Sequence, residues 1–512
     1  MNKIKWVLYL IVISVVVVFM IVGCGTVPDT KQPTYDTGLA TDENRNSTFN
    51  DEFPLQYQSY LNTLDDTQMT VYAGSVPHDK HDNINPLPVG YQYAQPYLKN
   101  LWLGYPFSYE YKRARGHAYA LEDILQIDRI NNYGESAILP SSCWNCKTTK
   151  MPVYLEEHGD DFWAMEFNYF REEQDLSDNT IGCSNCHQPT TMELRITSQP
   201  LNEALQRQGI DWQEASKNDM RSYVCGQCHV EYYFQKDVGI VEKVTFPWDY
   251  GFGPGDMYEY YSDGSVEKGF EGAFADWTHA VSGTPMLKTQ HPEFEHWIDG
   301  THGAAGVSCA DCHMPYVRED GKKKISSHHV TSPLNTIDQS CLQCHGDKTA
   351  QYLKERVIYT QERTWEQLML AQDISVRAHE AVRLASEYTG ERHPDYEKLL
   401  IEAREMVRKG QWYWDYISAE NSVGFHNPQK ALDTLASSQE YSRTAVDLAL
   451  RATRYRIAPQ LEGNIKEIVP PIMEHSRLLQ QNEAHLKSHI WLQYLPLLPQ
   501  TGKIWDLNRR IE

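Results

Sequence analysis

The sequence predicts a mainly α-helical protein with two contrasting parts, and three observations lead to this fold class. Beyond residue 350, apolar residues recur at intervals of three and four, the pattern of amphipathic helices, within residues 364–386, 396–416 and 430–454. Between residues 51 and 348 such stretches are scarce, and Gly, Pro and aromatic residues interrupt the chain. That part also holds five C-x-x-C pairs, whereas no Cys follows the last of them. We therefore expect short helices around each Cys pair and long helices over residues 350–512.

The N-terminus has the pattern of an export signal. Two lysines precede an uncharged apolar run of 17 residues, Trp6 to Val22, and Gly-Cys follows. A small residue before Cys at this position resembles a bacterial lipobox, so residues 1–24 are interpreted as a lipoprotein signal peptide with lipidated Cys24. Residues 25–50, rich in Thr, Asp, Asn and Pro, are interpreted as a flexible tether. The alternative is an uncleaved signal anchor, because 17 apolar residues come close to spanning a bilayer.

Both interpretations place the rest of the chain outside the cytoplasm. We expect it at the outer face of the cytoplasmic membrane or in the periplasm, tethered at its N-terminus. The formal net charge of −22 argues against nucleic acid, whose phosphates such a surface would repel. A small anionic substrate would need a local positive pocket, because the overall field opposes its approach.

Ten of the 11 cysteines form the C-x-x-C pairs, namely Cys143 and Cys146, Cys183 and Cys186, Cys225 and Cys228, Cys309 and Cys312, and Cys341 and Cys344. Five pairs cannot be divided into the four-thiolate sites of zinc ribbons, and disulfide scaffolds are usually short chains. In four pairs a histidine follows the second Cys: His187, His229, His313 and His345. C-x-x-C-H is the attachment signature of c-type haem, with the thiols bonded to the porphyrin and the His axial to iron. The sequence thus predicts a multihaem cytochrome c that carries five covalently bound haem c groups.

The first pair differs from the others, because Lys147 follows it in Cys143-Trp144-Asn145-Cys146-Lys147. A lysine binds iron only as the neutral amine, so the metal must displace a proton from a group that normally titrates at about pH 10.4. A changed axial ligand is a recognised means of altering haem reactivity. We therefore expect four haems to conduct electrons and the Lys147 haem to be catalytic. A degenerate haem site is the alternative, and the four intact His motifs argue against it.

This combination closely resembles cytochrome c nitrite reductase, the ammonia-forming pentahaem family. The resemblance runs from about Arg115 to about His426. It rests on C-W-N-C-K, the four C-x-x-C-H motifs, and the stretches Arg115-Gly116-His117, Ile127-Asp128-Arg129, Val230-Glu231-Tyr232-Tyr233 and Lys288-Thr289-Gln290-His291. It implies a multihaem cytochrome c fold with a haem-packed core and long C-terminal helices. It also implies six-electron reduction of nitrite to ammonium at the Lys-ligated haem, fed by four bis-His haems.

The resemblance implies three catalytic side chains on the open face of the Lys147 haem, matching Arg129, Tyr232 and His291. An Arg stays charged and can hydrogen-bond a bound anion. A His that titrates near working pH can stabilise charge or deliver protons, and a Tyr offers a hydroxyl donor. Without the family, a lone Arg is usually on the surface and a lone His or Tyr is usually packed. Only the matched set favours catalysis.

A calcium ion beside this haem is also implied by the resemblance. Its ligands would be the Glu231 carboxylate, the backbone carbonyls of Tyr232 and Lys288, and the side-chain oxygen of Gln290. An all-oxygen set suits a hard cation. The ion would orient Tyr232 and raise the local positive potential, which helps an anion enter an acidic protein.

Four distal histidines complete the implied set of haem ligands. The resemblance assigns His328 to the second haem, His117 to the third, His426 to the fourth and His302 to the fifth. His329 adjoins His328, so that assignment rests on spacing from His313. His279 and His296 are left over and are interpreted as structural or proton-path residues.

The implied partners are nitrite, a membrane-bound quinol-oxidising multihaem cytochrome as electron donor, and a second copy of the chain through the C-terminal helices. Two rival functions stay open. One is a multihaem enzyme that acts on hydroxylamine or sulfite. The other is an electron-transfer cytochrome in which all five irons are saturated.

Overall fold

The computed structural model describes residues 35–66, 68, 70, 72, 95, 97–108, 115–127, 140–236, 242–264, 272–319, 321 and 323–468. The expected signal peptide, Cys24, Arg129 and residues 469–512 lie outside the described residues. Within the described part of the chain, no helix combines the length and hydropathy needed to cross a bilayer.

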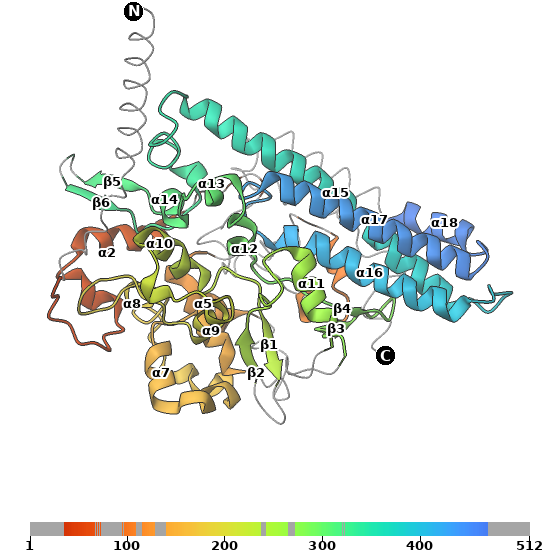
Figure 1. The fold of residues 1–512 in the computed structure, drawn as a ribbon, viewed down its shortest axis with the longest axis horizontal. Helices are drawn as coiled ribbons and strands as arrows, with labels where there is room; N and C mark the ends of the chain where they lie inside the picture. Colours follow the sequence, from red (N-terminus) through yellow and green to blue (C-terminus); the bar gives the residue numbers. More distant parts are fainter. Residues whose placement is uncertain are drawn as a thin grey trace, which may run out of the picture.

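The structure is mainly helical, as predicted, and its long helices lie side by side at one end (Figure 1). They are α15 (Ala350–Glu387), α16 (Tyr396–Ala419), α17 (Pro428–Ala452) and the shorter α18 (Ala458–Ile468). Each predicted helix is present. The structure extends α15 beyond its periodic stretch at both ends, and it extends α16 at its C-terminal end only. The first turn of α15 is exposed and therefore lacks apolar periodicity, but Thr349 caps it by accepting a hydrogen bond from the backbone N–H of Tyr352.

Small residues allow α16 and α17 to approach closely. A methyl group at Gly410 of α16 would collide with Ser442 of α17. The Ser438 hydroxyl donates to the Gly410 carbonyl at 2.6 Å, so a polar pair is satisfied inside the bundle. Fully buried Trp412 and Trp414 fill space on the other faces of α16. The buried side chains of the bundle join those of the preceding part of the chain in one continuous hydrophobic core.

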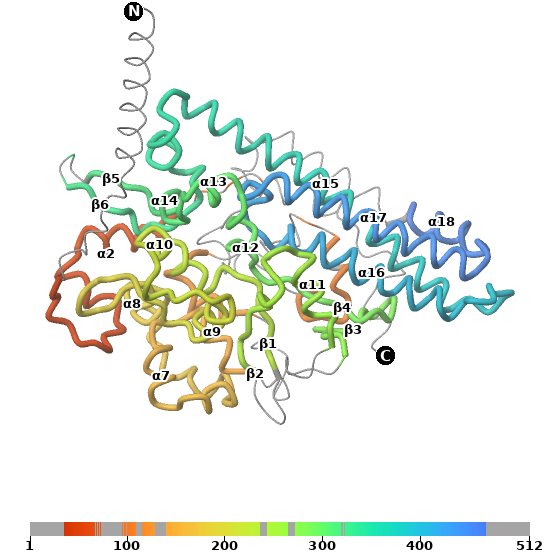
Figure 2. Tube along the Cα trace, viewed as in Figure 1, coloured from red at the N-terminus to blue at the C-terminus, as the bar shows by residue number. Residues whose placement is uncertain are grey.

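Short elements and loops make up the part that carries the Cys pairs, and the Cα trace winds through it without a central sheet (Figure 2). The α-helices are α2 (Pro54–Leu61), α4 (Leu98–Leu101), α5 (Ala120–Gln126), α7 (Met151–His158), α8 (Cys183–Cys186), α9 (Gln199–Arg207), α10 (Lys217–Gly226), α11 (Pro254–Ser262), α12 (Glu293–Trp297), α13 (Thr301–Ala304) and α14 (Cys309–His313). Three antiparallel hairpins accompany them: β1 (Tyr233–Lys236) with β2 (Glu242–Thr245), β3 (Trp277–Thr278) with β4 (Pro285–Met286), and β5 (Tyr316–Glu319) with β6 (Lys323–Ser326).

The predicted tether is wrong for residues 35–50, which pack on the body of the protein. The backbone N–H of Thr37 donates to the Thr190 carbonyl at 3.0 Å, and that of Asn46 donates to Asp178 at 2.9 Å. The Asn46 side chain is buried and donates to the Thr180 carbonyl. The polar composition that indicated a free chain instead satisfies backbone groups beside the second Cys pair.

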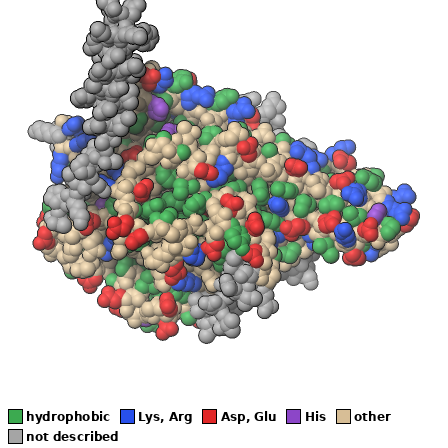
Figure 3. Space-filling view, viewed as in Figure 1, with side chains coloured by type: hydrophobic (Ala, Val, Ile, Leu, Met, Phe, Trp, Pro, Cys, Tyr) green, Lys and Arg blue, Asp and Glu red, His purple; other side chains and the backbone are tan. Residues whose placement is uncertain are grey.

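Acidic and basic side chains alternate over the face seen in Figure 3, with apolar side chains between them. This face therefore carries both signs of charge, although the net charge of the chain is strongly negative. A local site can hold its own sign of charge within such a mixed surface.

Candidate functional site

The Lys147 motif lies on a 3-10 helix, Ser141–Cys146, that one aromatic side chain anchors. Trp144 is fully buried and stacks on Phe167 with ring centroids 4.1 Å apart. Its indole N–H donates to the Phe167 carbonyl at 3.0 Å. The N–H of Lys147 donates to the Trp144 carbonyl, also at 3.0 Å. Trp144, between the two Cys, thus fixes the backbone of the motif.

The second Cys pair begins α8, where a glycine admits a close neighbour. A side chain at Gly182 would collide with Asn46. The side-chain oxygen of Asn46 accepts a hydrogen bond from the backbone N–H of Cys183 at 3.0 Å. The side-chain oxygen of Asn185 accepts one from the backbone N–H of Gly182 at 2.9 Å. These contacts satisfy the exposed donors of a one-turn helix. The segment that was expected to be a tether therefore helps to build this site.

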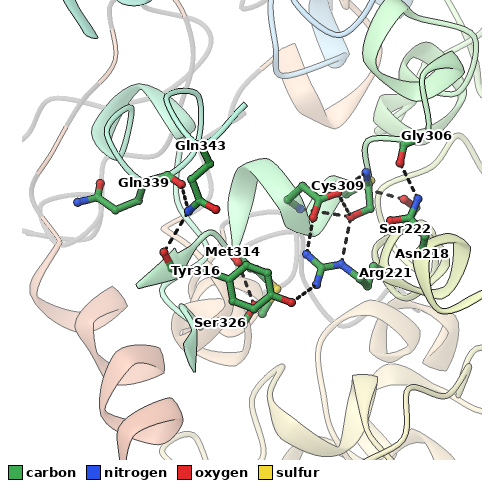
Figure 4. A network of polar contacts seen from close by, with 12 residues as sticks. Asn218, Arg221, Ser222, Gly306, Cys309, Met314, Tyr316, Ser326, Gln339 and Gln343 are labelled. Atoms are coloured by element: carbon green, nitrogen blue, oxygen red, sulfur yellow. Dashed lines mark hydrogen bonds and ion pairs between the residues drawn. The ribbon is translucent and has the colours of Figure 1, made fainter. Parts of the chain in front are cut away.

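A polar network centred on Arg221 fastens the third Cys pair to the fourth (Figure 4). Its guanidinium lies 2.7 Å from the Asp311 carboxylate and also donates to Ser308 and to the Tyr316 hydroxyl. Ser222, on the same helix, accepts from the N–H of Cys309 at 3.3 Å. Because Arg221 lies on α10 and Asp311 on α14, these contacts hold the two Cys-bearing helices at a fixed separation.

Four pairs of histidine rings face each other at nearly one distance. Each pair joins a histidine of a C-x-x-C-H motif to a distal histidine expected from the sequence. The centroid distances are 6.3 Å for His187 and His328, 6.3 Å for His229 and His117, 6.3 Å for His313 and His426, and 6.4 Å for His345 and His302. The structure thus brings together every axial pair that the resemblance implied.

One iron between two imidazoles accounts for this distance. Two metal–nitrogen bonds of about 2.0–2.1 Å, with about 1.1 Å from each nitrogen to its ring centre, give about 6.3 Å across one metal ion. Burial lowers the pKa of His117, His313 and His328 to about 4, so these rings are neutral at pH 7, the form that binds metal. The residues present therefore fit haem iron.

The ring nitrogens are also arranged for iron. Nδ1 of His187 lies 2.8 Å from the Met192 carbonyl, and Nδ1 of His328 lies 2.9 Å from the Ser326 carbonyl. An N–H that donates from Nδ1 leaves Nε2 with its lone pair free for a metal. The neighbouring His329 instead turns Nε2 to Asp66, at 3.1 Å. The structure thus separates the two adjacent histidines that spacing alone could barely distinguish.

Around Lys147 the surroundings differ, because no histidine motif supplies the second ligand. The rings of Tyr232 and His291 lie 6.4 Å apart. Lys147 lies close enough to His291 to affect its electrostatic surroundings, and Cys143 and Cys146 lie close enough to affect those of Tyr232. Two of the three expected catalytic side chains therefore meet at the Lys147 motif. The third, Arg129, lies outside the described residues.

The environment of His291 differs from the sequence expectation of a histidine that titrates near working pH. Burial lowers the pKa of His291 to about 4, although Glu293 opposes this shift. The ring is thus neutral at pH 7 in these surroundings and acts as a hydrogen-bond donor and acceptor. Burial also raises the pKa of Tyr232 well above its usual value, so its hydroxyl keeps its proton.

Three of the four expected calcium ligands are brought together. Glu231 is buried, and its two carboxylate oxygens accept from the N–H of Gln290 at 2.6 Å and from the Tyr261 hydroxyl at 2.9 Å. The Gln290 side-chain amide lies 3.3 Å from the Lys288 carbonyl. Rotating the Gln290 amide group by 180° exchanges its nitrogen and oxygen. The side-chain oxygen can therefore occupy the position beside the Lys288 carbonyl.

Lys288 presents its carbonyl because its ammonium is directed elsewhere. The ammonium lies 3.1 Å from Asp415, with both side chains fully buried, and 4.7 Å from the ring centre of Trp102. The N–H of Thr289 donates to the same carboxylate. Within the described residues no cluster of three or more His, Cys, Asp or Glu could hold a metal ion. The expected calcium set contains one carboxylate and is otherwise made of carbonyl oxygens, so it would not form such a cluster.

The two remaining histidines have different surroundings. His279 stacks on His379 with ring centroids 3.9 Å apart inside the helical region, which supports the structural interpretation. His296 is fully buried on α12, and neither ring nitrogen has a hydrogen-bond partner among the described residues. His379, Asp415 and Glu420 were missed in the sequence because they belong to no motif. In the sequence, each could be noticed only as a polar residue on the apolar face of a predicted helix, or directly after the C-terminal end of that helix.

Comparison with known proteins agrees with this geometry. The model of the cytochrome c552 family matches residues 45–492. The chain is 59% identical over 494 residues to the cytochrome c nitrite reductase subunit NrfA of Nitratidesulfovibrio vulgaris, covering 96% of this chain and 94% of that protein. Cytochrome c-552 of Bacteroides thetaiotaomicron is 38% identical and is matched over 73% of its length, which is 76% of this chain.

A solved structure is similar over nearly the whole fold. It is the cytochrome c nitrite reductase of Desulfovibrio desulfuricans, with a TM-score of 0.79 and 57% identity, matched over 92% of this chain and 99% of that one. Its description names two calcium sites in the catalytic subunit NrfA. The predicted multihaem fold is therefore confirmed, and c-type haem is its cofactor. With its Cys-pair motifs and its similarity over almost the entire length, the chain belongs to the cytochrome c nitrite reductases of the cytochrome c552 family.

Proposed function

We propose that this chain carries five haem c groups and reduces nitrite to ammonium, with six electrons, at the haem bound through the Lys147 motif. One observation carries the proposal. The rings of four histidine pairs lie 6.3–6.4 Å apart, whereas Tyr232 and His291 lie near the Lys147 motif. Among the described residues, this site therefore differs from the other four in having hydrogen-bonding groups nearby in place of a second histidine.

The bound haem would supply an iron that holds nitrite and transfers electrons to it singly. The Lys147 side chain would bind the iron through its neutral amine. His291, neutral in its buried position, donates a hydrogen bond to a substrate oxygen, and Tyr232 keeps a proton available at its hydroxyl. Arg129 would add the fixed positive charge that an anion needs in an acidic protein. Together these groups bind the anion and supply protons as its oxygens leave as water.

The remaining four haems would be bis-His and would carry electrons to the site. Their proposed distal ligands are His117, His302, His328 and His426. A histidine on both sides leaves iron no open position, so these groups exchange electrons but do not bind substrate. The rival reading as a pure electron carrier would require the Lys147 site to be closed in the same way, and among the described residues no histidine pairs with that motif at the 6.3–6.4 Å spacing of the other four.

We also assign one calcium ion to Glu231, Tyr232, Lys288 and Gln290. The buried Glu231 carboxylate and the closeness of Gln290 to the Lys288 carbonyl support this assignment, and the Desulfovibrio desulfuricans relative has calcium sites by its description. A divalent cation would compensate the cost of burying the carboxylate. It would also fix the backbone on both sides of the Tyr232–His291 pair.

The proposed setting is an exported protein, lipid-anchored through Cys24 at the outer face of the cytoplasmic membrane or in the periplasm. A membrane-bound quinol-oxidising multihaem cytochrome would be its electron donor, and the C-terminal helices would form a homodimer. Exposed Tyr352, Tyr359 and Ile401 on α15 and α16 supply apolar area for such an interface. Fractionation without detergent tests the anchor, since a fully soluble wild-type protein would refute it.

Turnover with a reduced viologen tests the function. The purified protein, shown to hold five haems, should convert nitrite to ammonium in equal amounts. No loss of nitrite would mean that the Lys147 site is closed, and the chain would then be an electron carrier. Efficient use of hydroxylamine or sulfite with little use of nitrite would favour the other rival.

A further inference from the structure

The Nδ1 atoms of the axial histidines do not all meet the same kind of acceptor. Nδ1 of His187, His328 and His313 each lies within 3.0 Å of a neutral backbone carbonyl. Nδ1 of His426 instead lies 2.6 Å from Oε1 of Glu420. Nδ1 of His229 also lies near a carboxylate, that of Glu293, but at 3.8 Å. Among the described residues Glu420 therefore brings a full negative charge closest to an axial histidine.

The Glu420 carboxylate is held in place by the turn that follows α16. Its side chain is fully buried, and its oxygens accept from the N–H of Ser422 at 3.1 Å and of Gly424 at 3.2 Å. Gly424 has a φ of +80° and a side chain there would collide with Thr364 and Ala431, so the turn needs glycine. No Lys or Arg within the described residues lies within ion-pair distance of Glu420, so its charge acts mainly on the His426 ring.

The direction of the contact is not that of an ideal hydrogen bond. Although Nδ1 and Oε1 are 2.6 Å apart, the N–H of His426 is not aimed at the oxygen, and Nδ1 has no geometrically regular acceptor among the described residues. Charge acts over distance whatever the angle, and in a buried site this interaction is only weakly screened. The argument from charge therefore holds independently of the hydrogen-bond angle.

We propose that Glu420 is a positioning residue that lowers the reduction potential of the haem held by His313 and His426. A carboxylate behind Nδ1 makes the imidazole a stronger donor to iron and adds negative charge near the metal, and both effects favour the ferric state. The inference rests on the proposed haem assignment. It makes this haem a stronger electron donor than the second haem, whose two ligands both rest on carbonyls.

Glu420→Gln tests the inference, because the amide keeps nearly the same shape without the charge. Asp299→Asn is the matched control. It removes a carboxylate from the same region, but this carboxylate contacts Lys430 and no axial histidine. In a redox titration followed by electron paramagnetic resonance, E420Q should raise the potential of one bis-His haem and leave the others unchanged. D299N should leave all of them unchanged. Five haems without a shift in E420Q, or an equal shift in D299N, would overturn the inference.

The wild-type protein offers a second measurement that does not depend on folding of a variant. In near-infrared magnetic circular dichroism, the charge-transfer band of a low-spin ferric haem moves to shorter wavelength as a histidine ligand gains imidazolate character. The haem held by His313 and His426 should therefore give a band apart from that of the second haem, and a single common band would refute the inference. Nitrite turnover with reduced viologen is measured on the same samples. Full turnover without a shift refutes only the role of Glu420, whereas no turnover in wild type refutes the proposed function.

Discussion

The ring of His328 lies 6.3 Å from that of His187, whereas the adjacent His329 directs its Nε2 to Asp66. The backbone at this point also accounts for the choice. The Ser59 hydroxyl accepts from the N–H groups of both histidines, at 2.7 Å and 3.1 Å. Helix α2, which carries Ser59, thereby fixes which of two neighbouring rings points to the second Cys pair.

This choice predicts opposite results for two adjacent substitutions. His328→Ala should open the sixth position of the second haem, so the reduced protein should bind carbon monoxide at one more haem than wild type. His329→Ala should leave carbon monoxide binding unchanged, because its ring meets only a carboxylate. Optical titration of reduced protein with the gas makes the measurement, and extra binding in H329A alone would reverse the ligand assignment.

The Lys147→His variant tests whether the amine ligand matters for catalysis. Histidine completes a regular C-x-x-C-H motif, so five haems should still attach. The first haem would then have the same axial residue as the electron-carrying haems. Nitrite turnover should fall by on the order of 10- to 100-fold, the range found when residues that support a metal site are changed. Steady-state turnover with reduced viologen and the haem content per chain are compared with wild type. Unchanged kinetics would show that the lysine is not important.

His291→Ala should remove most nitrite reduction and leave the four bis-His haems intact. Loss of a positioned proton donor costs on the order of 10²- to 10⁴-fold in rate. His393→Ala is a suitable control, because that ring is exposed near the start of α16. Persistent turnover in H291A, with spectra like those of wild type, would show that His291 does not deliver protons.

Much of the fold could be predicted because the C-terminal helices bury one face against protein. Their periodicity located α15, α16 and α17, while the exposed first turn of α15 had no apolar signal. The hairpins and one-turn helices could not be predicted in the same way. Where flat cofactors supply the core, side chains need not alternate with the period of a helix or strand.

Some residues of the candidate site could likewise be predicted from the sequence, and others could not. The Cys pairs and their histidines follow from local spacing, since one haem needs all three residues within a single turn. The distal histidines lie far away in sequence and came from the family resemblance. Glu420 and Asp415 were missed, because a lone acidic residue near a helix end is usually solvated. Only folding shows that Glu420 is buried against the His426 ring and Asp415 against the Lys288 ammonium.

Removal of calcium should lower nitrite turnover without loss of haem. Chelation would leave the Glu231 carboxylate uncompensated, which should loosen the loop that carries Gln290 and His291. Activity should fall by on the order of 10-fold and return with added Ca²⁺ but not Mg²⁺, which demands a smaller, octahedral site. Metal analysis and turnover are followed together. Full activity in protein shown to be calcium-free would contradict the assignment.

A buried histidine pair makes the stability of the helical region depend on pH. His379 is fully buried, with Nδ1 2.9 Å from the Ser282 hydroxyl and Nε2 2.8 Å from the side-chain oxygen of Gln411. Desolvation lowers the pKa of His379 to about 4, although the Gln411 contact opposes the shift. Between about pH 4 and pH 6.5 the unfolded chain therefore binds a proton that the folded protein does not bind.

Because the unfolded state takes up the extra proton, stability is complete above about pH 6.5 and is lost as the pH falls towards 4. For this one group the free energy of unfolding should be about 2 kcal/mol smaller at pH 5 than at pH 7. His379→Gln removes the titrating ring, so the difference between denaturant unfolding at the two pH values should shrink by about that amount. His393→Gln, at an exposed ring, should keep the wild-type difference. An equal pH dependence in wild type and H379Q would show that this histidine is already protonated inside the fold, with a partner stronger than the hydroxyl of Ser282.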